Sequence, residues 1–129
     1  MMIKAYLTWI STPYEGEDIE VRYRIFEDEE LILKESIFIE YTKPALCGLA
    51  SMSKLLKVLE KHIKKEIVII INDGALYELL NASSRTKKEE VQYFGHKVRK
   101  AVDKFYDIRI ENVGGDHLAI KEWNNILKP

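Results

Sequence analysis

Residues 66–80, EIVIIINDGALYELL, constrain the fold of this 129-residue chain more than any other segment. The five aliphatic residues at positions 67–71 are typical of a strand that is covered on both faces. The turn Asn72-Asp73-Gly74 then leads into leucines at helical spacing. A buried strand, a short turn and a helix form a building unit of α/β domains, whose sheets usually place ligands at the carboxyl ends of their strands. We therefore expect an α/β domain with Asp73 as a candidate functional residue.

The composition narrows the class of protein. At this length one core is more stable than two, so residues 1–129 are expected to form a single domain. The net charge of -1 argues against a surface that binds polyanions as a whole. Cys47 is the only cysteine, which excludes an intramolecular disulfide and a cysteine-based zinc site and fits a reducing compartment. With no apolar stretch of membrane-spanning or signal-peptide length, we expect a cytoplasmic protein without a membrane partner.

Three further strands are predicted before the buried one, at residues 3–12, 19–25 and 31–41, where polar and apolar residues alternate. Short turns connect them, which favours an antiparallel meander. Arg22 and Arg24 lie on the charged side of the second strand, which we expect to face solvent. After Pro44, apolar residues recur every three or four positions as far as Ile63 and predict an amphipathic helix. Such a helical crossover favours parallel pairing of the buried strand with the meander.

The second half of the chain continues the α/β pattern. A short helix is predicted at 74–81, and a longer one begins near Thr86, a candidate cap. A strand at 106–113, a glycine loop and a final helix at 118–127 follow, the helix having Ile120, Trp123 and Leu127 inward. The whole predicts a three-layer α/β fold with a five-stranded mixed sheet. Its first three strands are antiparallel, its fourth and fifth are parallel to the first, and helices flank it.

This order of elements resembles the ribonuclease H family over essentially the whole chain. Residues 67–80, IVIIINDGALYELL, resemble the family's strand that carries an Asp into a helix. Residues 113–117, VGGDH, resemble its loop that ends in Gly-His before the last helix. The resemblance implies the family's fold. In active members, carboxylates hold two divalent cations that stabilise the attacking and leaving oxygens of phosphodiester hydrolysis.

The acids that the resemblance implies are mostly missing. The family's first Asp falls in residues 7–12 and its Glu in residues 48–53, and neither segment contains an acid. Asp73 matches the third acid, while the fourth has no clean match, although Asp116 and Glu122 are near and His117 stands where the family has a mobile-loop His. Hard cations need several oxygen ligands, which one carboxylate cannot supply. We interpret the chain as a degenerate member and expect no hydrolysis.

Each candidate residue also has an ordinary structural interpretation. Asp73 and Asp116 are candidate ligands of one metal ion, yet Asn-Asp-Gly after a strand is also helix-capping chemistry. Asp116 and His117 are a candidate acid/base pair, or a solvated loop with a helix N-cap. Cys47 is interpreted as a small buried residue. No cofactor is expected, and Mg²⁺ or Mn²⁺ only if nuclease activity survives.

Two rows of lysines are candidate contacts to the phosphates of RNA, DNA or their hybrid: Lys54, Lys57 and Lys61, and Lys97, Lys100 and Lys104. Solvated helix faces give the same pattern. Tyr6, Trp9 and Tyr14, with Arg22 and Arg24, are candidates for stacking and phosphate contacts to a single strand, or for packing across strands.

Three functions therefore stay open. The first is a non-catalytic ribonuclease H-like module that binds nucleic acid or acts as an accessory in a nucleic-acid assembly. The second is a protein-interaction module, a homodimer through the meander's edge or the long helix. The third is a weak metal-dependent nuclease that uses the four candidate catalytic residues, Asp73, Asp116, His117 and Glu122.

Overall fold

A computed structural model describes residues 2–10, 18–40, 44–81 and 89–129. The cap predicted at Thr86 and the stacking role of Tyr14 fall outside these residues. The secondary structure in chain order is β1 (Met2–Ile10), β2 (Ile19–Glu27), β3 (Glu30–Ile39), α1 (Pro44–Leu59), the 3-10 helix η1 (Glu60–His62), β4 (Glu66–Ile71), α2 (Gly74–Leu80), α3 (Glu89–Asp103), β5 (Asp107–Asn112) and α4 (His117–Ile126).

The five strands form one mixed sheet in the order β3-β2-β1-β4-β5. β1 pairs antiparallel with β2, and β2 with β3, whereas β4 pairs parallel with both β1 and β5. Parallel neighbours need a long crossover, and α1 and α3 lie in the two crossovers. The topology confirms the predicted fold class, with β1 and β4 side by side at the centre of the sheet.

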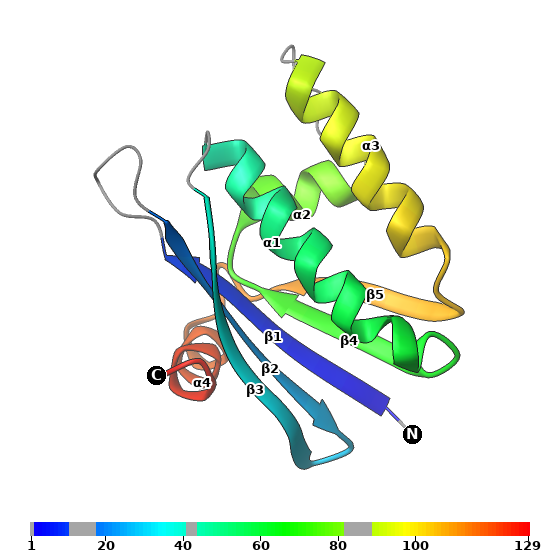
Figure 1. Cartoon of the computed structure of the whole chain (residues 1–129). Helices are drawn as coiled ribbons and strands as arrows, with labels where there is room; N and C mark the ends of the chain where they lie inside the picture. The colour runs from blue at the N-terminus through cyan, green and yellow to red at the C-terminus, as the bar shows by residue number, and fades with distance from the viewer. Residues whose placement is uncertain (1, 11–17, 41–43, 82–88) are drawn as a thin grey trace.

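Helices cover both faces of the sheet and make three layers (Figure 1). α1, α2 and α3 lie over one face, and α4 lies over the other. In β4, Ile67, Ile69 and Ile71 belong to the core under α1, while Val68 and Ile70 belong to the core under α4. All five are buried, which confirms the prediction of a strand covered on both faces.

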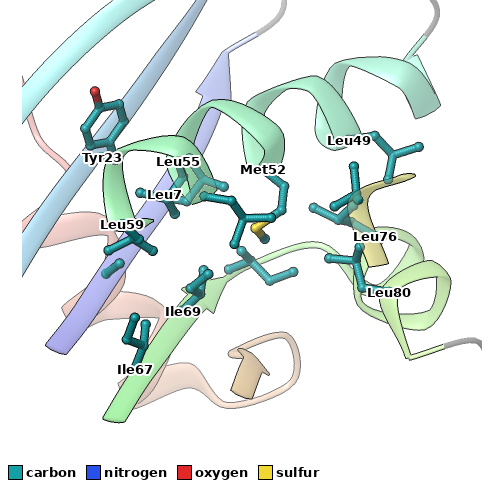
Figure 2. Packing of buried hydrophobic residues seen from close by; sticks show 14 of the residues in the cluster. Leu7, Tyr23, Leu49, Met52, Leu55, Leu59, Ile67, Ile69, Leu76 and Leu80 are labelled. Carbon is teal, nitrogen blue, oxygen red and sulfur yellow. The ribbon is translucent and has the colours of Figure 1, made fainter. Parts of the chain in front are cut away.

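The helix α1 supplies the centre of the larger core, which Figure 2 shows from close by. Its buried apolar residues recur every three or four positions and share one cluster with Leu7 and Ile69 of the sheet: Leu49, Met52, Leu55, Leu56 and Leu59. Truncating one of these side chains to Ala costs roughly 2–5 kcal/mol. Cys47 is buried in the same helix, as expected of a small core residue.

The smaller core joins α4 to the sheet. Leu127 packs with Tyr6, Val68 and Ile70, and Trp123 and Ile126 extend this cluster. The ring of Tyr6 meets that of Phe26 edge to face, with 5.7 Å between centroids. Trp123 and Leu127 therefore face inward as predicted. Ile120 was expected to join them; it is half-buried and lines a hollow on the surface of α4, and it is not part of this cluster.

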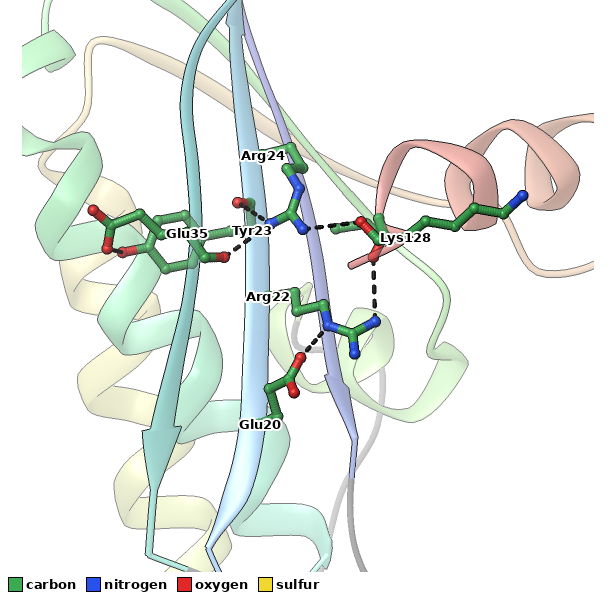
Figure 3. Close-up of polar contacts among 7 residues, drawn as sticks. Glu20, Arg22, Tyr23, Arg24, Glu35 and Lys128 are labelled. Carbon is green, nitrogen blue, oxygen red and sulfur yellow. Dashed lines mark hydrogen bonds and ion pairs between the residues drawn. The ribbon is translucent and has the colours of Figure 1, made fainter.

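The prediction that Arg22 and Arg24 face solvent is wrong, since the end of the chain covers that part of β2 (Figure 3). Arg24 is only 2% exposed, and its guanidinium donates hydrogen bonds to the carbonyl oxygens of Tyr23, Glu35 and Lys128 at 3.0, 2.9 and 3.1 Å. Arg22 is ion-paired with Glu20 and donates a longer bond, 3.4 Å, to the carbonyl oxygen of Leu127. Carbonyls at a helix C-terminus carry partial negative charge, which these cations balance. Burial, and then the charge of Arg22, lower the pKa of Arg24.

Candidate functional site

The carboxyl ends of β1 and β4 open into a cavity of about 230 Å³, which we name the strand-end cavity. The two strands are parallel neighbours, with Tyr6 opposite Ile70, so both end at the same edge of the sheet. Trp123 of α4 adds a wall from the other face. The lining consists of Leu7, Thr8, Trp9, Asn72, Asp73 and Trp123. Asp73, which follows the buried strand β4, thus lines a cavity at the carboxyl end of that strand, where the sequence predicted a functional residue.

Asp73 is also the N-cap of α2, so its capping role is confirmed. Its backbone is extended, and Oδ1 accepts a hydrogen bond from the backbone N–H of Leu76 at 2.8 Å. Its own N–H donates to Oδ1 of Asn112 at 3.1 Å. The same amide oxygen accepts from the N–H of Gly114, also at 3.1 Å. Asn112, which the sequence analysis did not single out, therefore links the ends of β4 and β5.

Asp116 caps α4 in the same manner, since its Oδ1 accepts from the N–H of Ala119 at 3.1 Å. His117 and Glu122 are exposed on α4 and line its outer hollow. Of the four candidate catalytic residues, only Asp73 lines the strand-end cavity. Among the residues that the structure describes, no group of three or more His, Cys, Asp and Glu side chains is arranged to hold a metal ion. A metal ion at Asp73 and Asp116 stays a prediction.

Trp9 and Gly48 meet where the two acid-free segments come together. A Cβ built on Gly48 would lie 3.0 Å from Cζ2 of Trp9 and 3.5 Å from its Cη2. A contact of 3.0 Å is tighter than nine in ten real Cβ contacts, so the six-membered ring of Trp9 lies this close to α1 because residue 48 has no side chain. The resemblance to ribonuclease H places carboxylates in these same segments. The chain instead has a large aromatic ring packed against a glycine.

Two polar groups beside this contact differ in how they are satisfied. Ser51 is fully buried, and its hydroxyl donates to the carbonyl oxygen of Cys47, one turn earlier in α1, at 2.8 Å. Nε1 of Trp123 is buried and has no hydrogen-bond partner among the described residues. The hydroxyl of Ser51 is thus satisfied within its own helix, whereas the buried Nε1–H of Trp123 is unsatisfied among the described residues.

The lysines predicted to contact phosphates lie on the outer surface of the α1 and α3 layer. All six are exposed, on or next to helices that pack against each other: Lys54 and Lys57 of α1, Lys61 of η1, Lys97 and Lys100 of α3, and Lys104 directly after α3. Within the described part of the chain, no carboxylate forms an ion pair with any of them. Nζ of Lys97 lies 5.3 Å from the ring centre of Tyr93, itself 68% exposed. We call the six exposed lysines together the lysine face.

The edge strand β3 was one of the two expected interfaces of a homodimer, beside the long helix. It carries three exposed apolar side chains, Leu31, Ile32 and Phe38. Lys34 and Glu35 are exposed at its middle, and its register with β2 shifts between Ile25 and Phe26. Charges and irregularities of this kind discourage pairing with another strand.

None of the helices in the described ranges is long and apolar enough to cross a membrane.

Comparison with known proteins agrees with this architecture. No protein-family model and no curated protein sequence matches the chain. RNase H1 from the halophilic archaeon Halobacterium salinarum NRC-1 superposes with a TM-score of 0.80 at 14% identity, over 98% of this chain and 94% of its own. The N-terminal RNase H domain of rv2228c from Mycobacterium tuberculosis gives 0.76 at 10% identity, over 98% and 95%.

LC11-RNase H1, isolated from compost by a metagenomic approach, was solved in complex with an RNA/DNA hybrid. It gives a TM-score of 0.75 at 11% identity, over 97% of this chain and 96% of its own. At 10–14% identity, these three structures share their fold with this chain over 97–98% of its length. The protein has the ribonuclease H fold.

Proposed function

We propose that this protein is a ribonuclease H-like module that binds nucleic acid without hydrolysing it. The contact between Trp9 and Gly48 carries this proposal. It fills the meeting point of the two segments in which the resemblance places carboxylates, so the strand-end cavity is left with Asp73 as the one acid in its lining. A pair of hard cations needs several oxygen ligands, and without them the family's hydrolysis has no metal centre.

The lysine face supports binding to a nucleic-acid backbone. Its six lysines are exposed along α1, η1, α3 and the turn after α3, and they form no ion pair with described carboxylates. On a chain whose net charge is -1, such a surface is a local site for phosphates. LC11-RNase H1, which has the same fold, was solved with an RNA/DNA hybrid, and this makes a hybrid the first ligand to test.

Binding is tested by fluorescence anisotropy at low salt with a labelled RNA/DNA hybrid, duplex DNA and single strands. We expect saturable binding that is weakened by the triple variant Lys97→Gln, Lys100→Gln, Lys104→Gln. The matched control removes three lysines from the opposite side of the sheet, Lys34→Gln, Lys121→Gln, Lys128→Gln, and changes the net charge equally. No binding to any of the ligands, or equal losses in the two triple variants, would contradict the proposal.

Hydrolysis is tested separately, by incubating the same hybrid with Mg²⁺ or Mn²⁺. We expect no cleavage above that of a protein-free reaction. Cleavage that disappears in Asp73→Asn would instead identify a weak nuclease, since Asn keeps the cap on α2 but removes the charge. That result would overturn the non-catalytic part of the proposal and leave the binding part standing.

A further inference from the structure

We propose that α3 and the turn after it bind single-stranded nucleic acid, with bases stacked on Tyr93 and Tyr106 and phosphates held by the lysines between them. This inference rests on the proposed function and names the class of nucleic acid that this part of the lysine face prefers. A duplex keeps the faces of its bases stacked inside, so only its backbone and groove edges are accessible. A single strand offers the faces of its bases as well.

The two tyrosines are unusually exposed. Tyr93 is 68% exposed and Tyr106 84%, whereas the other tyrosines in the described ranges are buried or half-buried: Tyr6, Tyr23 and Tyr77. Tyrosine side chains are usually at least partly covered, because the ring carries a large apolar surface. Exposed aromatic rings beside a row of cations are typical of surfaces on which the bases of a single strand stack.

The tyrosines lie at the two ends of one row of side chains. Tyr93, Lys97 and Lys100 are spaced by four and three residues, which places them on one face of α3. Lys104, four residues further, continues the row in the turn after the helix, and Tyr106 lies two residues beyond it. At 1.5 Å per residue, the row from position 93 to position 104 is roughly 16 Å long, which is enough for a few nucleotides.

Both rings are held by contacts that exist before any ligand binds. The backbone N–H of Tyr106 donates a hydrogen bond to the carbonyl oxygen of Ile63 at 3.0 Å, and the neighbouring Phe105 is buried in the core. Nζ of Lys97 lies 5.3 Å from the ring centre of Tyr93, so an aromatic face and a cation already stand together. Because this backbone is ordered in advance, stacking a base on these rings costs little further ordering of the chain.

The charges along the row favour phosphates at its middle and bases at its ends. Between the two tyrosines, residues 94–105 carry four lysine or arginine charges and one acid, Asp103. Further acids lie beyond each end, as Glu89 and Glu90 in the first turn of α3 and as Asp107 after the second tyrosine. Carboxylates repel phosphates, so the uncharged rings at the ends are left to the bases.

Two short oligonucleotides of equal length separate the bases from the phosphates. One is a labelled oligothymidine, and the other has a stable abasic analogue at every position. We expect fluorescence anisotropy to show at least fivefold tighter binding of the oligothymidine, which is about 1 kcal/mol and the low end of what one stacked base contributes. Because both strands carry the same phosphates, this ratio should stay constant as the salt concentration rises.

Variants assign this ratio to the two rings. The double variant Tyr93→Leu, Tyr106→Leu should bring the two affinities within about twofold of each other, with folding checked by circular dichroism. Tyr93→Phe, Tyr106→Phe should keep the ratio, since stacking needs the ring and not the hydroxyl. Phe38→Leu is the matched control and should keep it too, because Phe38 is 65% exposed on the edge strand β3. The triple variant of Lys97, Lys100 and Lys104 should weaken both strands by the same factor.

The outcomes separate this inference from the proposed function. Equal affinities for oligothymidine and the abasic strand overturn the inference, and so does a ratio that the double leucine variant keeps. Both results leave binding through phosphates intact. Failure of every single strand, duplex and hybrid to bind at low salt overturns the proposed function, and this inference with it.

Discussion

Nη2 of Arg24 donates a hydrogen bond to the carbonyl oxygen of Lys128 at 3.1 Å and so ties the middle of β2 to the end of the chain (Figure 3). Arg22 reaches the neighbouring carbonyl of Leu127. The two arginines thus fix the C-terminal end of α4 on the sheet, and α4 carries Trp123, a wall of the strand-end cavity. A contact far from the cavity in sequence therefore helps to set its shape.

Replacing Arg24 with Met should lower the free energy of unfolding by about 1.5–3 kcal/mol, because three hydrogen bonds from a buried charged group are lost. Urea denaturation followed by circular dichroism measures this. Lys34, which pairs with Arg24 across the strands and is exposed, provides the control Lys34→Met, whose effect should stay within about 0.5 kcal/mol. Equal effects of the two substitutions on the free energy of unfolding would contradict the structural role assigned to Arg24.

The arginines also mark where sequence reasoning fails. The alternation of Arg22 and Arg24 with apolar residues on β2 is that of a solvated strand face, and nothing local reveals that residues 127 and 128 will cover it. By contrast, residues 67–71 were predictable as a strand covered on both faces, because an unbroken aliphatic run leaves no face for water.

The strand-end cavity was predictable from the sequence only in part. The capping of α2 by Asp73 was one of two interpretations of a local motif, and local chemistry sufficed to propose it. The contact between Trp9 and Gly48 joins residues of β1 and α1 that no spacing rule connects. The sequence shows that a large and a small residue stand in the two segments where the resemblance implies carboxylates. Only the structure shows that these two residues touch.

Gly48→Ala should be destabilising by about 1–3 kcal/mol in the natural chain, since its Cβ would lie 3.0 Å from Cζ2 of Trp9. In a Trp9→Ala background the same change should be stabilising by up to about 1 kcal/mol, because Ala is the better helix former. A double-mutant cycle by urea denaturation measures this coupling. Additive effects of the two substitutions would show that the ring does not depend on the glycine.

Rebuilding acids at this contact should create metal affinity. The double variant Trp9→Asp, Gly48→Glu would add two carboxylates near Asp73, and hard cations need such oxygen ligands. Titration with Mn²⁺, followed by water-proton relaxation, should show binding to this variant and none to the natural chain. The isosteric control is Trp9→Asn, Gly48→Gln. Equally tight binding by the natural chain would mean that its metal site is intact and that the non-catalytic proposal is wrong.

Stability should depend on pH through His62. Burial, together with the charges of Lys65 and Lys61, lowers its pKa below the ordinary 6.5, against the opposing effect of Glu27. The unfolded chain therefore takes up a proton below pH 6.5 that the folded chain resists, so stability is kept above this pH and falls as the pH drops below it. The urea midpoint of His62→Gln should vary less than that of the natural chain between roughly pH 7.5 and pH 5. His96→Gln, on an exposed face of α3, is the control, and a profile identical to it would count against the assignment.

The salt dependence of binding should count the phosphates that the lysine face contacts. For single-stranded DNA each neutralised phosphate contributes about -0.7 to the slope of log K against log salt concentration. If Lys97, Lys100 and Lys104 each contact one phosphate, replacing all three with Gln should reduce the magnitude of the slope by about 2. Anisotropy titrations over a series of salt concentrations measure it, with the Lys34, Lys121 and Lys128 triple variant as the control of equal charge. A slope that falls equally in both variants would point to the overall charge of the protein, and one that falls in neither would place the phosphate contacts elsewhere.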